Sequence, residues 1–269
     1  MRWPAPSTAR WLILVGLLAF WELMPRTKII PELFLPSLSN TLTVLYTDRF
    51  DYIEALGVTI YEVAIAMVFA CGVGILVGAV VGGVALLRNL LLPVFSSLYA
   101  VPIVILYPIF TAWLGIGSES KIASAAIYGF FPVMLSTAAG IRTIDPQYVL
   151  AARSMGATLS QQIARVIIPA SIPTVLTGLR LGGALTIIGV VVAEMLTSAA
   201  GIGYLVTRYR TILDSPRVFA AILMILALSV MFDVLARMVE KRTLVWRTAG
   251  RSPKRSRADL QTVPAGAPA

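Results

Sequence analysis

Six ionisable side chains fall inside or beside strongly apolar stretches of this 269-residue chain. They are Glu22, Glu62, Arg180, Glu194, Asp233 and Arg237. Ionisable residues within membrane segments are costly, and they mark either transport pathways or paired structural contacts. Asp233 and Arg237 are four residues apart, so we expect them to pair on one helix face. Arg180 is interpreted as extending to the membrane interface. Glu194 is either a pathway or gate residue or a structural hydrogen-bond partner.

The sequence lacks the residue types needed for several kinds of catalysis and metal binding. It contains no histidine and one cysteine, Cys71, which lies inside an apolar run. Histidine-dependent triads, histidine-ligated zinc, cysteine metal clusters and intrachain disulfides are therefore excluded. No GxxxxGK[ST] pattern is present, so the chain has no phosphate-binding loop of its own. We expect no enzyme activity, no metal and no cofactor on this chain.

Long apolar runs must position these charged residues. The composition is 58% hydrophobic and only 13% charged, which is typical of a polytopic α-helical membrane protein. We predict an all-α fold with six transmembrane helices. They lie at about 11–24, 58–87, 90–114, 121–141, 174–196 and 218–239. The first run is interpreted as an uncleaved span rather than a signal peptide, because no small-residue cleavage site follows it.

The distribution of lysine and arginine predicts the orientation of these spans. With both termini in the cytoplasm, the inner segments carry more of these residues than the outer segments. Residues 1–10 then form a cytoplasmic N-terminus and 11–240 the transmembrane domain. Residues 241–269 are basic and rich in serine, proline and alanine, so we expect a disordered cytoplasmic tail.

Two spans carry glycines at intervals of four residues. They are Gly74, Gly78 and Gly82 in the second span, and Gly178 and Gly182 in the fifth. Such stripes let another helix approach closely. We favour packing within the fold over a contact between subunits. The third span contains Pro93, Pro102 and Pro108, so we expect a broken helix inside the bundle rather than a straight one facing lipid.

A half-polar segment, 145–169, separates the fourth and fifth spans. Asp145–Pro146 is typical of a helix start, and Gly156 supplies a left-handed residue that ends a helix. Thr158 and Gln161 have the spacing of a capping box that begins a second helix, which Pro169 is expected to stop. We therefore predict a compact cytoplasmic hairpin that enters a groove on another protein. An interfacial helix on the membrane is the alternative.

This segment resembles the cytoplasmic loop of the membrane subunits of binding-protein-dependent ABC importers. That family has E-A-A-x-x-x-G, nine further residues, and then I-x-L-P. Here Leu150–Ala152 precede Gly156, and Val166–Pro169 close the pattern after nine residues. Leu150 replaces the glutamate of the family. The stretches "LPSLSNTLTVL", "LGIGSESKIASAAIYGFFPVMLSTAAGI", "GLRLGGALTIIGVVVAEML" and "GIGYL" also resemble its nitrate/sulfonate/taurine branch, so that the resemblance covers roughly 30–240.

The resemblance implies a type I ABC importer permease in the bacterial cytoplasmic membrane. Its implied partners are a second permease subunit, here expected as a homodimer, two ATPase subunits that bind ATP and magnesium, a substrate-binding protein and membrane lipid. The expected ATPase-coupling residues are Ala151, Ala152, Arg153 and Gly156. The expected solute is small and anionic: a sulfonate, taurine, nitrate, an aromatic acid or a vitamin precursor.

Three polar residues are candidates for the lining of the translocation pathway. They are Ser136, Thr186 and Glu194. The alternative function is a secondary transporter without an ATPase partner. That class typically has an internal repeat and an ion-binding core, and we find no inverted repeat in this sequence.

Overall fold

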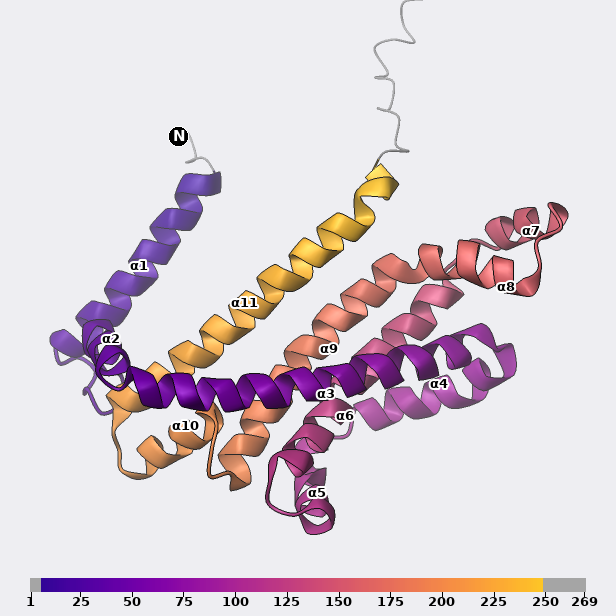
Figure 1. The fold of residues 1–269 in the computed structure, drawn as a ribbon. Helices are drawn as coiled ribbons and strands as arrows, with labels where there is room; N and C mark the ends of the chain where they lie inside the picture. The colour runs from indigo at the N-terminus through magenta and orange to yellow at the C-terminus, as the bar shows by residue number, and fades with distance from the viewer. Residues whose placement is uncertain (1–5, 249–269) are drawn as a thin grey trace, which may run out of the picture.

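The computed structural model describes residues 6–248, and their arrangement is a bundle of long helices (Figure 1). The chain order is α1 (Pro6–Arg26), α2 (Leu38–Thr47), α3 (Arg49–Gly83), α4 (Ala85–Tyr99), η1 (Ile103–Leu106), α5 (Tyr107–Leu114), α6 (Ser118–Arg142), α7 (Pro146–Ser154), α8 (Leu159–Gln162), η2 (Ile163–Ile167), α9 (Ile168–Thr197), α10 (Ile202–Thr211) and α11 (Ser215–Thr248). The chain is an all-α polytopic membrane protein.

Within residues 6–248, five helical segments are long and apolar enough to span a membrane. They are Thr8–Arg26, Arg49–Gly83, Ser118–Arg142, Leu159–Thr197 and Ser215–Thr243. Ala85–Tyr99 and Ile103–Leu114 pass the same test only as a pair, and they are bent relative to one another by 84°, so they make a sixth span if the pair crosses the membrane as one broken helix.

The bend lies in the middle of the expected third span. Pro102 stands in the break, and because proline has no amide hydrogen it cannot continue the helical hydrogen bonds across it. Pro93 is accommodated inside α4, and Pro108 lies in the first turn of α5, where proline is tolerated. The prolines thus predict a broken span, but only one of the three marks the break.

Other boundaries also differ from those expected. The second span was placed at 58–87, but α3 ends at Gly83 and Val84 adopts an extended conformation before α4 begins. The tail was expected to be disordered from 241, whereas α11 continues to Thr248. Residues 249–269 of that tail, and residues 1–5 of the expected N-terminal segment, lie outside the described residues.

The centre of the bundle is formed by α3, α6 and α9, which approach closely at glycines. A Cβ atom on Gly78 of α3 would lie 2.5 Å from the Met134 carbonyl oxygen of α6. A Cβ atom on Gly182 of α9 would lie 2.7 Å from the Gly129 carbonyl oxygen of α6. Any side chain at these positions would therefore push the helices apart. The structure places both glycine stripes at contacts within this chain.

The opposite ends of the bundle carry different short helices (Figure 1). At one end, α2 and α10 lie near the start of α3, and α5 lies at the start of α6. At the other end, α7 and α8 project beyond the end of α6 and the start of α9. The α10 end is closed by a buried apolar cluster that includes Tyr52, Ile202 and Tyr209.

The first and last helices pack sparsely against the rest. The spanning part of α1 is 6% buried and that of α11 is 17% buried, compared with 50% for α6. Arg180 of α9 does not simply extend to the interface as expected. Its guanidinium contacts Asp233 of α11 at 2.6 Å, and Asp233 also pairs with Arg237. Asp233 therefore connects two helices as well as two turns of α11.

Candidate functional site

The 145–169 segment begins with a capped helix, α7. The Asp145 side chain accepts a hydrogen bond of 2.9 Å from the Gln147 amide, and Pro146 occupies the first turn. Gly156 ends the helix with a φ of 77°, in the left-handed region that glycine adopts without strain. The Gly156 amide donates to the Arg153 carbonyl and the Ala157 amide to the Ala152 carbonyl, which is the Schellman pattern.

A capping box begins the second half of the hairpin. The Thr158 hydroxyl accepts from the Gln161 amide, while the Gln161 side chain accepts from the Thr158 amide at 2.9 Å. The neighbouring residue, Gln162, was not singled out from the sequence. It is buried, donates to the Ala157 carbonyl at 2.8 Å and accepts from the Arg153 side chain at 3.2 Å. Gln162 therefore holds α7 and α8 together.

The four expected coupling residues do not all lie on the surface. Ala151, Arg153 and Gly156 are exposed, but Ala152 is only 5% exposed. Ala152 is buried within this chain, and its direct contact with a partner stays a prediction. Larger apolar side chains of the hairpin are exposed, and three of them, Leu150, Met155 and Leu159, we call the hairpin tip. Their exposed fractions are 65%, 81% and 68%.

Pro169 does not stop the second helix as expected. Helix α8 continues through the π-helical turn η2 and then directly into α9. In this turn the Ile168 amide donates to the Ile163 carbonyl, five residues earlier. The wider turn accommodates a proline that can neither donate a hydrogen bond nor tolerate the usual carbonyl beneath its ring. The second half of the hairpin and the span are thus one continuous helical segment, Leu159–Thr197.

At the α10 end, Glu194 is almost completely buried, with 1% exposed. One carboxylate oxygen accepts from the Thr59 hydroxyl at 2.8 Å, and the other accepts from the Gly203 amide at 2.8 Å. The Thr59 hydroxyl in turn accepts from the Ile202 amide at 3.0 Å. Glu194 therefore caps the start of α10, where a negative charge meets free amides and the positive end of the helix dipole.

A buried ion pair lies beside this cap. Lys121 of α6 pairs with Glu62 of α3, and both side chains are at most 5% exposed. The Lys121 ammonium also donates to the Ser198 hydroxyl at 3.1 Å, and Ser118 donates to Glu62 at 2.8 Å. The pairing was missed from the sequence because Glu62 and Lys121 are far apart in the chain and Lys121 was placed at a span end.

The remaining pathway candidates lie at helix contacts. Thr186 is fully buried and donates to the Gly182 carbonyl at 2.9 Å. Ser136 is half-buried against Gly178. Within one chain, Thr186 and Glu194 therefore serve packing and capping.

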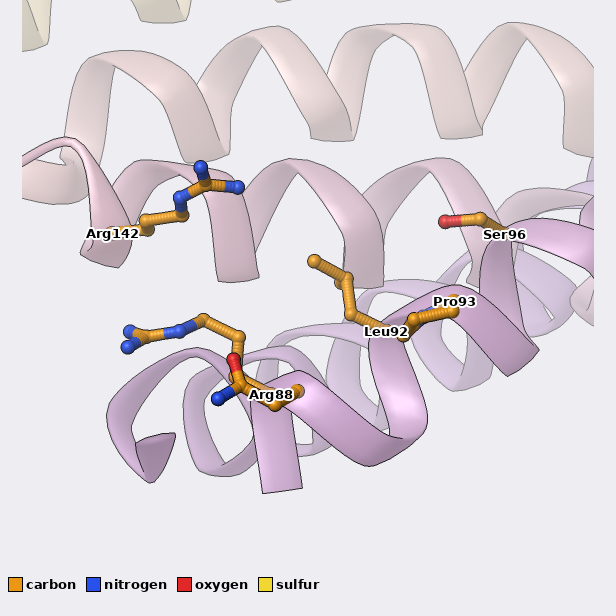
Figure 2. A pocket seen from close by; sticks show the side chains of 6 residues that line it. Arg88, Leu92, Pro93, Ser96 and Arg142 are labelled. Carbon is orange, nitrogen blue, oxygen red and sulfur yellow. The ribbon is translucent and has the colours of Figure 1, made fainter. Parts of the chain in front are cut away.

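A pocket of about 660 Å³ lies at the hairpin end of the bundle, between α4 and α6. It is lined by Arg88, Asn89, Leu92, Pro93, Ser96 and Arg142. Figure 2 shows the Arg88 side chain on α4 and the Arg142 side chain at the end of α6, on the two sides of this pocket.

Residues 70–245 match the family model described as the binding-protein-dependent transport system inner membrane component. The chain belongs to this family. The match contains the hairpin, the three central helices from Ala70 onward, and Glu194. The chain is thus an ABC importer permease, which is a multi-pass protein of the inner membrane, and ATP hydrolysis in such transporters takes place on separate subunits.

Curated relatives place this permease in the sulfonate/taurine branch. It is 30% identical to the putative aliphatic sulfonates transport permease protein SsuC of Bacillus subtilis, over 87% of this chain and 85% of the relative. It is 28% identical to the taurine transport system permease protein TauC of Escherichia coli, over 91% and 94%. It is also 28% identical to the formylaminopyrimidine transport permease protein ThiX of Halalkalibacterium halodurans, over 88% and 94%.

Solved structures support the fold of the permease. A chain of the MetNI methionine ABC transporter in an inward-facing conformation superposes with a TM-score of 0.60. It is 16% identical, and the match covers 75% of this chain and 98% of that one. An amino acid ABC transporter crystallised with histidines gives the same TM-score at 18% identity, over 74% and 96%.

Proposed function

We propose that this permease carries a small anionic solute across the membrane and is driven by an ATPase that binds its 145–169 hairpin. The observation that carries the proposal is the hairpin itself. It is closed by two caps and Gln162, it projects beyond the bundle, and it exposes an apolar tip (Figure 1). A rigid apolar projection suits insertion into a groove, because little conformational entropy is lost on binding.

The proposed assembly contains two copies of this chain, two ATPase subunits and a substrate-binding protein at the α10 end. ATP and magnesium are held by the ATPase subunits. The hairpin is continuous with α9, so ATP-driven movement of the ATPase would move the span with it. In this proposed assembly the hairpin end faces the cytoplasm, and both termini are then cytoplasmic.

The proposed solute class comes from the relatives, which are named for aliphatic sulfonates, taurine and formylaminopyrimidine. Two of these three names describe anionic or zwitterionic sulfonates. A half-buried hydroxyl, Ser136, is retained as a pathway candidate. Roles in the pathway for Thr186 and Glu194 require that their present contacts open during transport.

The coupling role is tested by changing the tip without disturbing the interior of the hairpin. We expect Met155→Asp to lower retention of the partner ATPase on the purified permease by at least about tenfold, since it places a charge in an apolar contact. The matched control is Ile212→Asp. It makes the same kind of change at a residue that is 65% exposed at the other end of the bundle.

Equal retention by Met155→Asp and the original protein would show that the hairpin is not the ATPase contact. Solute specificity is measured separately, as stimulation of ATP hydrolysis by the binding protein loaded with taurine, alkanesulfonates or pyrimidines. Solute uptake by the permease alone, without ATPase, would instead support a secondary transporter.

A further inference from the structure

The pocket between α4 and α6 contains two arginines without a carboxylate partner among the described residues. Four other arginines of the described chain, Arg26, Arg180, Arg217 and Arg237, form ion pairs. Neither Arg88 nor Arg142 does, and the pocket lining contains no acidic side chain. Two guanidinium groups that share one space repel each other unless an anion neutralises them.

Besides the two positively charged arginines, the pocket lining contains neutral hydrogen-bond donors. Asn89 and Ser96 line the same pocket and can donate from an amide and a hydroxyl group. Leu92 and Pro93 form the apolar part of the lining. A volume of about 660 Å³ is ample for a sulfonate or phosphate group with a short attached chain.

The position of Arg88 is fixed by the fold. One of its guanidinium nitrogens donates to the Gly82 carbonyl at 3.2 Å, at the end of α3. This bond satisfies one of the carbonyls left free at a helix end, and it leaves the other guanidinium donors available. Arg142 is the last residue of α6, and its side chain lines the pocket from the α6 side (Figure 2).

We propose that Arg88 and Arg142 form a binding site for an oxyanion, of the sulfonate or phosphate type, at the hairpin end of the permease. Guanidinium groups match the geometry of such oxyanions with paired hydrogen bonds, and they remain charged at all physiological pH values. Basic residues at this end also follow from the usual charge bias of cytoplasmic segments. That bias does not require that two of them line one pocket.

The location of the site gives an occupant a means of acting on the hairpin. Arg142 is followed by Thr143 and Ile144, and Asp145 then caps α7. An anion held by Arg142 and Arg88 therefore fixes the base of the hairpin to the start of α4. The cytoplasmic placement rests on the function proposed above, in which this end faces the ATPase. The solute after its release or an anionic lipid headgroup supplies the same chemistry.

Binding is tested on the full-length permease alone, in nanodiscs of phosphatidylcholine. Thermal unfolding is followed as ethanesulfonate is added, with chloride at the same ionic strength as the reference. We expect ethanesulfonate to raise the unfolding temperature. In Arg88→Gln and Arg142→Gln we expect the apparent Kd to rise at least about tenfold, because each loses a charge-assisted hydrogen bond. Arg165→Gln is the control, since it removes an exposed arginine of the same end that does not line the pocket.

A second series replaces part of the lipid with phosphatidylglycerol and adds no soluble anion. A rise that appears only with this lipid, and that is lost in the Arg88 and Arg142 variants, supports the site and identifies a lipid headgroup as its occupant. If neither probe raises the unfolding temperature, or if Arg165→Gln loses the effect to the same extent, the site is refuted. No ATPase is present in these measurements. A negative result would therefore refute the oxyanion site without bearing on whether the hairpin binds the ATPase.

Discussion

Removing Lys121 should destabilise the permease much more than removing an arginine from an exposed ion pair. Glu62 is fully buried, and its contacts are the Lys121 ammonium and the Ser118 hydroxyl. Its second carboxylate oxygen has no hydrogen-bond partner. The substitution Lys121→Met keeps much of the side-chain volume but leaves this carboxylate without its counter-charge. Breaking a buried pair in this way costs about 3–5 kcal/mol.

The double substitution separates the ion pair from simple loss of packing. In Glu62→Gln with Lys121→Met, no uncompensated charge remains, and replacing both members of a buried pair is often close to neutral. We therefore expect the double variant to recover most of the stability that Lys121→Met loses. The free energy of unfolding is measured in mixed micelles by raising the fraction of SDS and following tryptophan fluorescence.

The exposed pair between Arg26 and Glu22 provides the control. Its side chains are 59% and 26% exposed, so we expect Arg26→Met to cost less than about 1 kcal/mol. The reasoning is refuted if Lys121→Met also costs less than about 1 kcal/mol, or if the double variant is as unstable as the single one. Either result would mean that Glu62 does not depend on Lys121.

Two further substitutions test the caps at opposite ends of the bundle. Gly201→Ala should lower the free energy of unfolding by about 2 kcal/mol or more in the same measurement. The φ of Gly201 is 99°, and the added Cβ would lie 2.0 Å from a Glu194 carboxylate oxygen. The control is Gly57→Ala, which should not destabilise the protein because nothing lies within 4 Å of the added Cβ. Thr158→Ala should lower the local stability of the hairpin by about 1 kcal/mol. We expect faster amide hydrogen exchange at Gln161 and an unchanged exchange rate in α3. An exchange rate at Gln161 equal to that of the original protein would contradict the cap.

Local signals in the sequence were the most informative. The residues that cap the hairpin were predicted from spacing alone, because Asp145, Gly156 and Thr158 act on amides or dihedral angles within a few residues of themselves. Long apolar runs likewise predicted the order of the five candidate spans and of the bent pair between the second and third of them. Both kinds of signal depend on residues that are close together in the sequence, so they can be recognised without knowing how the helices pack.

Features that depend on packing between distant segments were not predicted. The burial of Ala152 and the role of Gln162 arise only when α7 folds back on α8. The contact of Glu62 with Lys121 joins two different spans. The failure of Pro169 to stop a helix has another origin. A proline predicts the loss of one hydrogen bond, but the neighbouring residues decide whether the chain breaks or widens into a π turn.

The continuous segment Leu159–Thr197 joins the second half of the hairpin to the fifth span. Its 39 residues correspond to about 58 Å at the usual rise of 1.5 Å per residue. A rotation of about 10° at one end would therefore sweep the other end through about 10 Å. Glu194 lies near the end of α9 that is remote from the hairpin, and its carboxylate accepts a hydrogen bond from the Gly203 amide in the first turn of α10. A rotation of α9 would therefore also move the first turn of α10.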